Sequence, residues 1–328
     1  MGDLCQLNGP RFEFDIASVE YPAILRDTPD PPRVLRGIGN PAALQPGIAI
    51  IGSRKATPYG LACAEMFASH IAARGIPIIS GGAMGCDQCA HRAALDGGCP
   101  TVVVFGSGAD VTYPKRGREL FQRVIDAQGA VISENPWGTQ PLRPTFVRRN
   151  RIIAGLAALV LIVEAGLPSG TFSTADAALR ANRDVAAVPG SITSPNSRGT
   201  NHLIAQGAYC VVDTQTLDTA IDLAWAHNMY AMLAEGVPGG ESAPDDDLIG
   251  DDPVLRALAA EALLRPAARG LLRLLSRRAL ETPGRLRARQ PHPTWHGRPL
   301  PARATALGKK GIVICNSSHH ETRRCGQW

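Results

Sequence analysis

The sequence predicts an α/β fold with a doubly wound, mostly parallel sheet. Short apolar, β-branched runs alternate with segments of helical periodicity between residues 48 and 212, and polar turns follow most of the runs. Strands that alternate with helices at this spacing form right-handed βαβ units, and continuous apolar runs are typical of strands covered on both faces. The expected strands are 48–51, 76–80, 101–105, 130–132, 159–163, 185–188 and 209–212. The expected helices are 60–74, 87–97, 117–128, 147–157, 172–182 and 199–207.

The first expected strand, Ile48–Ile51, runs directly into the polar turn Gly52-Ser53-Arg54-Lys55. Doubly wound sheets bind ligands beyond the carboxyl ends of their strands, where free N–H groups and the dipole of the next helix attract anions. Arg54 and Lys55 add two positive charges, so we interpret this turn as a phosphate site. The turn lacks the Gly-x-Gly-x-x-Gly and Gly-x-x-x-x-Gly-Lys-Ser/Thr patterns, so the sequence supports neither a nicotinamide enzyme nor a P-loop ATPase.

Polar, glycine-rich loops also follow the later strands, at 80–87, 106–110, 133–135, 164–171 and 189–193. The carboxyl ends of parallel strands share one edge of the sheet, so we expect these loops to form a single crest. Ser169-Gly170-Thr171 opens a helix there, and its N–H groups and hydroxyls suit a second phosphate contact. The crest residues to which we assign a structural role are Ser80, Gly81, Gly85, Asp87, His91 and Glu164.

Asp87 and His91 lie one helical turn apart, a spacing that suits either acid–base chemistry or two metal ligands. We favour a structural interpretation, in which Asp87 caps the helix that begins there and His91 hydrogen-bonds inside the crest. Cys86 and Cys89 form a Cys-x-x-Cys pair, but no second pair follows at the spacing of a zinc site. We therefore expect no metal and no cofactor.

The cluster Arg148-Arg149-Asn150-Arg151 is placed by the pattern at the start of the helix before strand 159–163. Three arginines at a helix N-terminus oppose the helix dipole and repel one another, and a polyanionic ligand would resolve that conflict. The alternative is a solvated basic helix end that pairs with Glu134 or Glu164. Phe146, just before the cluster, is either a core residue or a face for base stacking.

The pattern divides the chain into four parts. Residues 1–46 are expected to be an extended, proline-rich lead-in packed on the first strand, followed by the sheet domain at 47–230. A linker rich in Gly, Pro and Asp is expected at 231–252. We expect a short helical segment and a basic, loosely structured or disordered tail at 253–328.

Composition and charge narrow the class of protein. The chain has 328 residues, 45% hydrophobic and 19% charged, which is typical of globular proteins. The segment after Pro283 holds nine basic residues and one acidic residue and therefore carries a charge of +8. Because the whole chain has a net charge of +5, the rest carries −3, and a polyanion site there must be a local patch. No apolar run approaches the roughly 20 residues of a membrane span, and no signal peptide is recognisable. We expect a cytoplasmic protein with reduced cysteines.

Several strings resemble the DNA-processing protein A family (DprA/Smf), in order from Tyr21 to Asp213. They are GSRKATPYG, SGGAMGCDQCAH, Tyr113-Pro114-Lys115, Ser133-Glu134, Phe146 with RRNRIIAGL, Val163-Glu164-Ala165, SGT and VPGSITSPNSRGTNHLI. The resemblance implies an extended Rossmann-like fold that binds single-stranded DNA without sequence preference. It also implies a homodimer that loads RecA recombinase in natural transformation, and a protein without an established catalytic reaction.

The resemblance also assigns roles to individual residues. Arg54 resembles the family's DNA-contacting arginine, and Lys115, Phe146, Arg149, Asn150 and Arg151 match positions that line the same groove. Together with the phosphate sites above, the predicted DNA-binding residues are Gly52, Ser53, Arg54, Lys55, Lys115, Phe146, Arg148, Arg149, Asn150, Arg151, Ser169, Gly170 and Thr171.

Two other functions compete with DNA binding. One is a nucleotide or N-glycoside hydrolase similar to the lysine-decarboxylase-like group, which carries a Pro-Gly-Gly-x-Gly-Thr-x-x-Glu string. The corresponding segment here, Leu167–Thr174, lacks the catalytic glutamate of that string. The other is a regulatory protein whose crest binds a small nucleotide.

Overall fold

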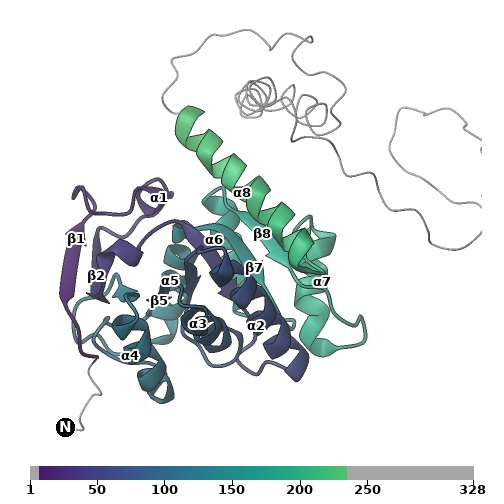
Figure 1. Ribbon diagram of the computed structural model, residues 1–328, viewed down its shortest axis with the longest axis horizontal. Coiled ribbons are helices and arrows are strands. Elements are labelled where there is room, and N and C mark those ends of the chain that lie inside the picture. Colours follow the sequence, from purple (N-terminus) through teal and green to yellow (C-terminus); the bar gives the residue numbers. More distant parts are fainter. Residues whose placement is uncertain (1–6, 235–328) are drawn as a thin grey trace, which may run out of the picture. The chain divides into compact units, whose positions relative to one another are not determined.

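The computed structural model describes residues 7–234. The expected helical segment and basic tail at 253–328 lie outside the described residues, as does most of the expected linker. Within the described part, nine strands form one sheet in the order β1-β2-β6-β5-β4-β3-β7-β8-β9 (Figure 1). The strands are β1 (Arg11–Asp15), β2 (Val34–Gly39), β3 (Gly47–Ile51), β4 (Ile78–Ser80), β5 (Thr101–Val104), β6 (Ala130–Ser133), β7 (Ala157–Ile162), β8 (Asp184–Ala187) and β9 (Tyr209–Cys210).

The predicted mostly parallel α/β sheet is confirmed, because β3 to β9 all pair in parallel and correspond to the seven expected strands. Helices connect them as βαβ units require, and six of these helices match the expected ones. The helices are α1 (Ala23–Arg26), α2 (Pro58–Ala73), α3 (Cys86–Asp96), α4 (Arg118–Asp126), α5 (Arg143–Leu156), α6 (Thr171–Arg180), α7 (Arg198–Ala205) and α8 (Thr214–Ala234).

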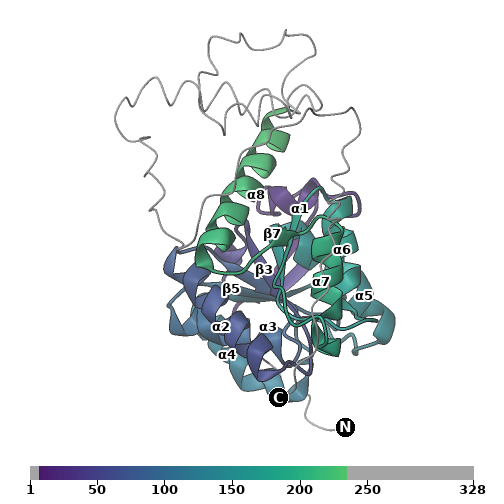
Figure 2. The same cartoon turned by 90° about the vertical axis from the view of Figure 1, so that its right-hand side faces the viewer.

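Helices cover both faces of the sheet. Successive residues of a strand point to opposite faces, so Ile48 and Ile50 pack in a cluster with α2, α3 and α8, whereas Ala49 and Ile51 pack with α1, α5 and α6. Val103 and Val131 form a third cluster with α4. Figure 2 shows α2, α3 and α4 on one side of the sheet and α5, α6 and α7 on the other. Burial of both faces explains the uninterrupted apolar runs in the strands.

The lead-in at 1–46 differs from our expectation that it packs on the first strand. It contains β1 and β2, which extend the sheet as an antiparallel pair, and β2 joins the sheet at β6 with Arg36 opposite Ser133. Residues of β1 alternate between charged, exposed positions and half-buried phenylalanines, Phe12 and Phe14. This alternation of period two is the sequence signal for a strand with one covered face, and proline content masked it.

Helix α8 is a further element that our pattern did not predict, after β1, α1 and β2. Leu217, Ala220, Ile221 and Ala224 recur at helical spacing and pack on the face covered by α2. Ion pairs join the two helices, because Arg74, the residue directly after α2, contacts Asp218 and Asp222 of α8 at 2.5 and 3.2 Å. None of the helices between residues 7 and 234 has both the length and the apolar character needed to cross a bilayer.

The order of the strands defines a switch point beside β3. From β3 the chain proceeds through α2 to β4 on one side, while α5 carries it from β6 back to β7 on the other side of β3. The loop after β3 leads to α2 on one face and the loop after β7 leads to α6 on the opposite face. Loops that diverge in this way leave a crevice at the carboxyl ends of the two strands, where α/β proteins bind ligands.

Candidate functional site

A cleft of about 630 Å³ lies at this switch point. The turn after β3, the middle of α5 and the loop before α6 line it. The predicted residues that the cleft brings together are Gly52, Ser53, Arg54, Lys55, Phe146, Arg149, Asn150, Ser169, Gly170 and Thr171. Three predicted residues, Lys115, Arg148 and Arg151, are not part of its lining.

The turn after β3 rests directly on the first residues of α3. Gly85, the residue before α3, has φ of +86°, and a side chain there would collide with the backbone oxygen of Ser53. The N–H of Cys86 donates to that same oxygen at 3.3 Å. The backbone of the turn is thereby held down, while the side chains of Arg54 and Lys55 are exposed at the edge of the cleft.

Glu164 supports the same turn from the other end, where α2 begins. Its buried carboxylate accepts hydrogen bonds from the N–H and the hydroxyl of Thr57 at 2.9 and 2.5 Å. The Thr57 hydroxyl in turn accepts from the N–H of Gly60 and caps α2. Ser80 ties β4 to β3 by donating to the backbone oxygen of Ile50 at 2.6 Å. Both Glu164 and Ser80 thus hold the crest together.

Arg149 lies buried beneath the cleft. Its guanidinium donates to the backbone oxygen of Gly81, the residue after β4, at 2.7 Å. It also donates to the backbone oxygen of Val104, the last residue of β5. Burial lowers the pKa of Arg149 to about 10, with Arg54 acting in the same direction and Asp87 opposing. Burial likewise raises the pKa of Asp87, and the positive charge of Arg149 counteracts that rise. Arg149 of α5 and Asp87 of α3 are thus two buried groups of opposite charge, each of which stabilises the charged form of the other.

The arginine cluster does not open its helix, which corrects our placement. Helix α5 begins at Arg143, more than a turn earlier, with Pro144 in its first turn, a position that proline favours. The conflict with the helix dipole therefore does not arise. On a helix, Phe146, Arg149 and Asn150 lie on one side, and Arg148 points to the opposite side.

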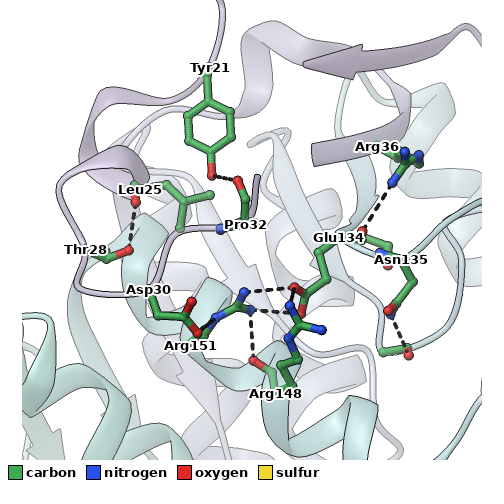
Figure 3. Close-up of polar contacts among 12 residues, drawn as sticks. Tyr21, Leu25, Thr28, Asp30, Pro32, Arg36, Glu134, Asn135, Arg148 and Arg151 are labelled. Carbon is green, nitrogen blue, oxygen red and sulfur yellow. Dashed lines mark hydrogen bonds and ion pairs between the residues drawn. The ribbon is translucent and has the colours of Figure 1, made fainter. Parts of the chain in front are cut away.

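The carboxylate of Glu134 forms ion pairs with the two arginines that lie outside the cleft. Its carboxylate, whose side chain is only 6% exposed, contacts Arg148 at 3.1 Å and Arg151 at 2.8 Å (Figure 3). Arg151 also donates to Asp30 at 2.7 Å, in the segment between β1 and β2. Arg148 and Arg151 therefore form ion pairs with Glu134, as the alternative interpretation of the cluster proposed. Glu164, the other acid named in that interpretation, is bonded to Thr57 instead. The three arginines do not form one continuous basic groove.

Phe146 supplies an aromatic surface at the cleft. Its ring is half-buried and packs so closely over Gly106, at the end of β5, that a Cβ there would lie 2.7 Å from it. On another side it meets Tyr113, with ring centroids 5.1 Å apart. Lys115 begins a short 3₁₀ turn, Lys115–Gly117, and is exposed.

His91 is fully buried and does not line the cleft. Its Nδ1 lies 2.8 Å from the hydroxyl oxygen of Thr101, and that hydroxyl donates its only proton to the backbone oxygen of Ile78. Nδ1 must therefore carry the proton, which leaves Nε2 as a buried acceptor without a hydrogen-bond partner. Burial lowers the pKa of His91 to about 3. Ile78 and Thr101 are the first residues of β4 and β5, so His91 has a structural role, as expected, but it bonds at the end of the sheet opposite the crest.

Asp87 does not cap α3, which corrects our expectation, because Gly85 is the N-cap residue and Asp87 lies within the first turn. Its carboxylate accepts instead from the N–H of Ala83, at 3.3 Å, in the loop that leads into α3. Cys86 is buried, and the Cys89 thiol donates to the backbone oxygen of Leu61. Within residues 7–228, no three His, Cys, Asp or Glu side chains are grouped so that they could bind a metal ion.

The N-terminus of α6 gives the cleft a further positive end. Gly170 precedes the helix without a side-chain cap, and the first turn has no acidic residue. Ser173 and Asn196 also line the cleft, and the amide of Asn150 donates to the Ser173 hydroxyl at 2.7 Å. We did not predict Ser173 or Asn196, although Ser173 follows the Ser-Gly-Thr string by two residues. Exposed cations, a helix N-terminus, hydroxyls and one aromatic face together suit a phosphate-bearing ligand with a ring.

Comparison with known proteins identifies a matching family. The sequence model of DNA recombination-mediator protein A matches residues 14–222. Protein Smf of Escherichia coli (strain K12) is 40% identical over 216 residues, which cover 65% of this chain and 58% of Smf. DNA processing protein DprA of Streptococcus pneumoniae is 40% identical over 203 residues, 62% of this chain and 71% of that protein. The matched part of the chain spans 58% of the length of the E. coli relative and 42% of the length of a relative from Mycobacterium tuberculosis.

Two solved structures share the fold. The X-ray structure of DprA from S. pneumoniae aligns with a TM-score of 0.60 and 38% identity, over 63% of this chain and 73% of that one. The structure of DNA processing protein A from Helicobacter pylori, described for its single-stranded DNA binding mode, aligns with a TM-score of 0.58 and 27% identity. That alignment covers 66% of this chain and 97% of the H. pylori chain.

Proposed function

Because this chain belongs to the DNA recombination-mediator protein A family, we propose that it binds single-stranded DNA through the cleft at the switch point of its sheet. The observation that carries the proposal is the meeting of Arg54 and Lys55, exposed after β3, with the N-terminus of α6, whose first turn has no acidic residue, and the ring of Phe146. Cations and N–H groups bind phosphates, and an aromatic ring stacks on any base.

The proposed binding does not depend on base sequence. The cations and hydroxyls among the residues that line the cleft suit the sugar-phosphate backbone, which is the same for every base. A ring such as Phe146 stacks on every base, since each base has a π face. Single strands expose these faces, whereas a duplex hides them.

We assign the predicted contacts unequal weight. Arg54 and Lys55 supply the phosphate contacts, because both side chains are exposed at the cleft. Arg149 supports the cleft from below through its bonds to Gly81 and Val104. Arg148 and Arg151 are engaged by Glu134 on the other side of α5, so their contribution to DNA binding is indirect. Lys115 remains a predicted contact outside the cleft.

Arg54→Ala is expected to weaken binding to labelled oligothymidylate by roughly tenfold to a hundredfold, because a hydrogen bond to a charged group contributes about 1.5–3 kcal/mol. The logarithm of the binding constant should also fall less steeply with the logarithm of salt concentration, by about one unit of slope, since one phosphate contact is lost. Fluorescence anisotropy at several salt concentrations measures both quantities.

Arg123→Ala serves as the matched control for Arg54→Ala. Arg123 lies on α4, is similarly accessible and pairs with Asp96, so its loss should leave both affinity and salt slope unchanged. Binding that is insensitive to salt, or equal effects of the two substitutions, would contradict the proposed site.

We propose a binding role in place of a catalytic one. The related proteins are named for DNA processing and recombination, and those names state no enzymatic activity. The two buried carboxylates at the crest, Asp87 and Glu164, are engaged by the Ala83 N–H and by Thr57. Release of free base from a nucleoside monophosphate by the purified protein would contradict this role.

We further propose, from the family membership, that the protein acts in the cytoplasm as a homodimer, protects incoming single strands and loads RecA recombinase on them in natural transformation. Two measurements test this extension. Light scattering should give the mass of a dimer, and the protein should shorten the lag before RecA filaments form on coated single strands. An unchanged lag would contradict the loading role while leaving DNA binding intact.

A further inference from the structure

Beside the cleft lies a second aromatic ring that the family strings include but to which no role has been assigned. Tyr113 is 41% exposed, and its ring centroid lies 5.1 Å from that of Phe146, with the planes tilted by 43°. Phe146 itself lines the cleft, whereas Tyr113 stands next to it outside the lining. The two rings therefore form one aromatic surface that continues from the cleft on to the outer face of the crest.

Packing against the crest holds this aromatic surface in place. Phe146 packs over the backbone of Gly106, in the loop directly after β5, so the ring that Tyr113 contacts is held against the crest. The Tyr113 hydroxyl makes no hydrogen bond to any group between residues 7 and 228. The fold therefore uses the ring face of Tyr113 and leaves its polar end free, although exposing so much of an apolar ring to water is unfavourable.

Cations flank the two rings. Lys115 and Arg116 follow Tyr113 and are exposed, and Arg143, also exposed, precedes Phe146 by one helical turn. Residues three apart on a helix lie on the same side, so Arg143 and Phe146 share a face of α5. Aromatic rings interleaved with basic residues are the pattern by which proteins follow a single strand, stacking bases on the rings and holding phosphates with the charges.

We propose that Tyr113 is a second base-stacking residue, which extends the path of the DNA strand from the cleft across Phe146 toward Lys115. This inference rests on the proposed function and deepens it, because it gives the strand a direction of exit from the cleft and predicts at least one additional bound nucleotide. It also gives Lys115, which lies outside the cleft, a place along the path of the strand.

Binding of two probes tests the role of the ring: labelled oligothymidylate, and an abasic oligodeoxynucleotide of the same length. Tyr113→Ala should weaken binding of oligothymidylate about fivefold or more, since removing a stacking ring costs about that factor at least. Binding of the abasic strand, which has phosphates but no bases, should change by less than about twofold. Tyr113→Phe keeps the ring and should behave as the wild type on both probes.

A purely structural role of Tyr113 would give a different result. Tyr113→Leu preserves apolar packing against Phe146 but has no π face, so it should weaken oligothymidylate binding as Tyr113→Ala does, with an unchanged melting temperature. Equal losses on both probes, or wild-type binding by Tyr113→Leu, would overturn the inference. If the wild type binds oligothymidylate with the expected salt dependence and Tyr113→Ala binds it with the same affinity, only this inference fails. If the wild type does not bind, the proposed function fails as well.

Discussion

Arg149→Ala is expected to lower the free energy of unfolding by about 3–5 kcal/mol, the cost of removing one partner of a buried, hydrogen-bonded charge. The substitution leaves the backbone oxygens of Gly81 and Val104 without their donor, and it leaves the buried carboxylate of Asp87 without its neighbouring cation. Urea unfolding monitored by circular dichroism measures the loss. An effect of this size is exceptional for a single substitution and identifies a structural residue.

Arg148→Ala is the matched control, because it removes the same side chain from the adjacent position of α5. The Arg148 side chain is 63% exposed and contacts Glu134 at 3.1 Å. An ion pair with one exposed partner contributes about 0–1 kcal/mol, so stability should change little. If Arg149→Ala were as stable as Arg148→Ala and weakened only DNA binding, Arg149 would be a direct DNA contact.

Acidification is expected to destabilise the protein through His91. The pKa of this imidazole is lowered by burial from 6.5 to about 3, so the unfolded chain binds a proton that the folded chain excludes. Stability from this group is present above pH 6.5 and is lost as pH falls toward 3. The slope approaches about 1.4 kcal/mol per pH unit, and the loss between pH 7 and about pH 4 is roughly 3 kcal/mol.

His91→Gln isolates this contribution. Glutamine does not titrate and retains an amide group that can donate to the Thr101 hydroxyl. Other titrating groups, Asp87 among them, are present in both proteins, so the difference between the two unfolding free energies as a function of pH reports His91 alone. The wild type should lose stability relative to the variant on acidification. Parallel curves would show that His91 can be protonated in the folded state.

Much of the architecture could be predicted from local pattern. Short apolar, β-branched runs that alternate with helical segments predicted β3 to β9, and the polar turns after them predicted the crest. The elements outside the predicted pattern include β1, α1, β2 and α8, although the patterns of β1 and α8 are regular. In β1 the charged and aromatic residues alternate, and in α8 the stripe beginning at Leu217 has helical spacing.

The candidate site was predictable in composition but not in detail. The turn with Arg54 and Lys55, the ring of Phe146 and the Ser-Gly-Thr string all line one cleft, as the meeting of post-strand loops predicts. The error concerned the arginines of α5. An error of four residues in the expected start of the helix placed the whole cluster at its N-terminus, and the charges then appeared to need an external anion.

The sequence by itself determined which segments are strands and helices and which loops meet at the crest, because periodicity and turn chemistry are local properties of the chain. Only the tertiary structure decided which charges remain available to a ligand. Glu134 engages Arg148 and Arg151, Asp30 reaches Arg151 from 121 positions away, and two strand ends enclose Arg149. These partners are brought together by packing of distant elements, so the pattern of charges along the chain does not reveal them. Among the basic residues predicted to bind DNA, the fold leaves Arg54 and Lys55 exposed at the cleft itself.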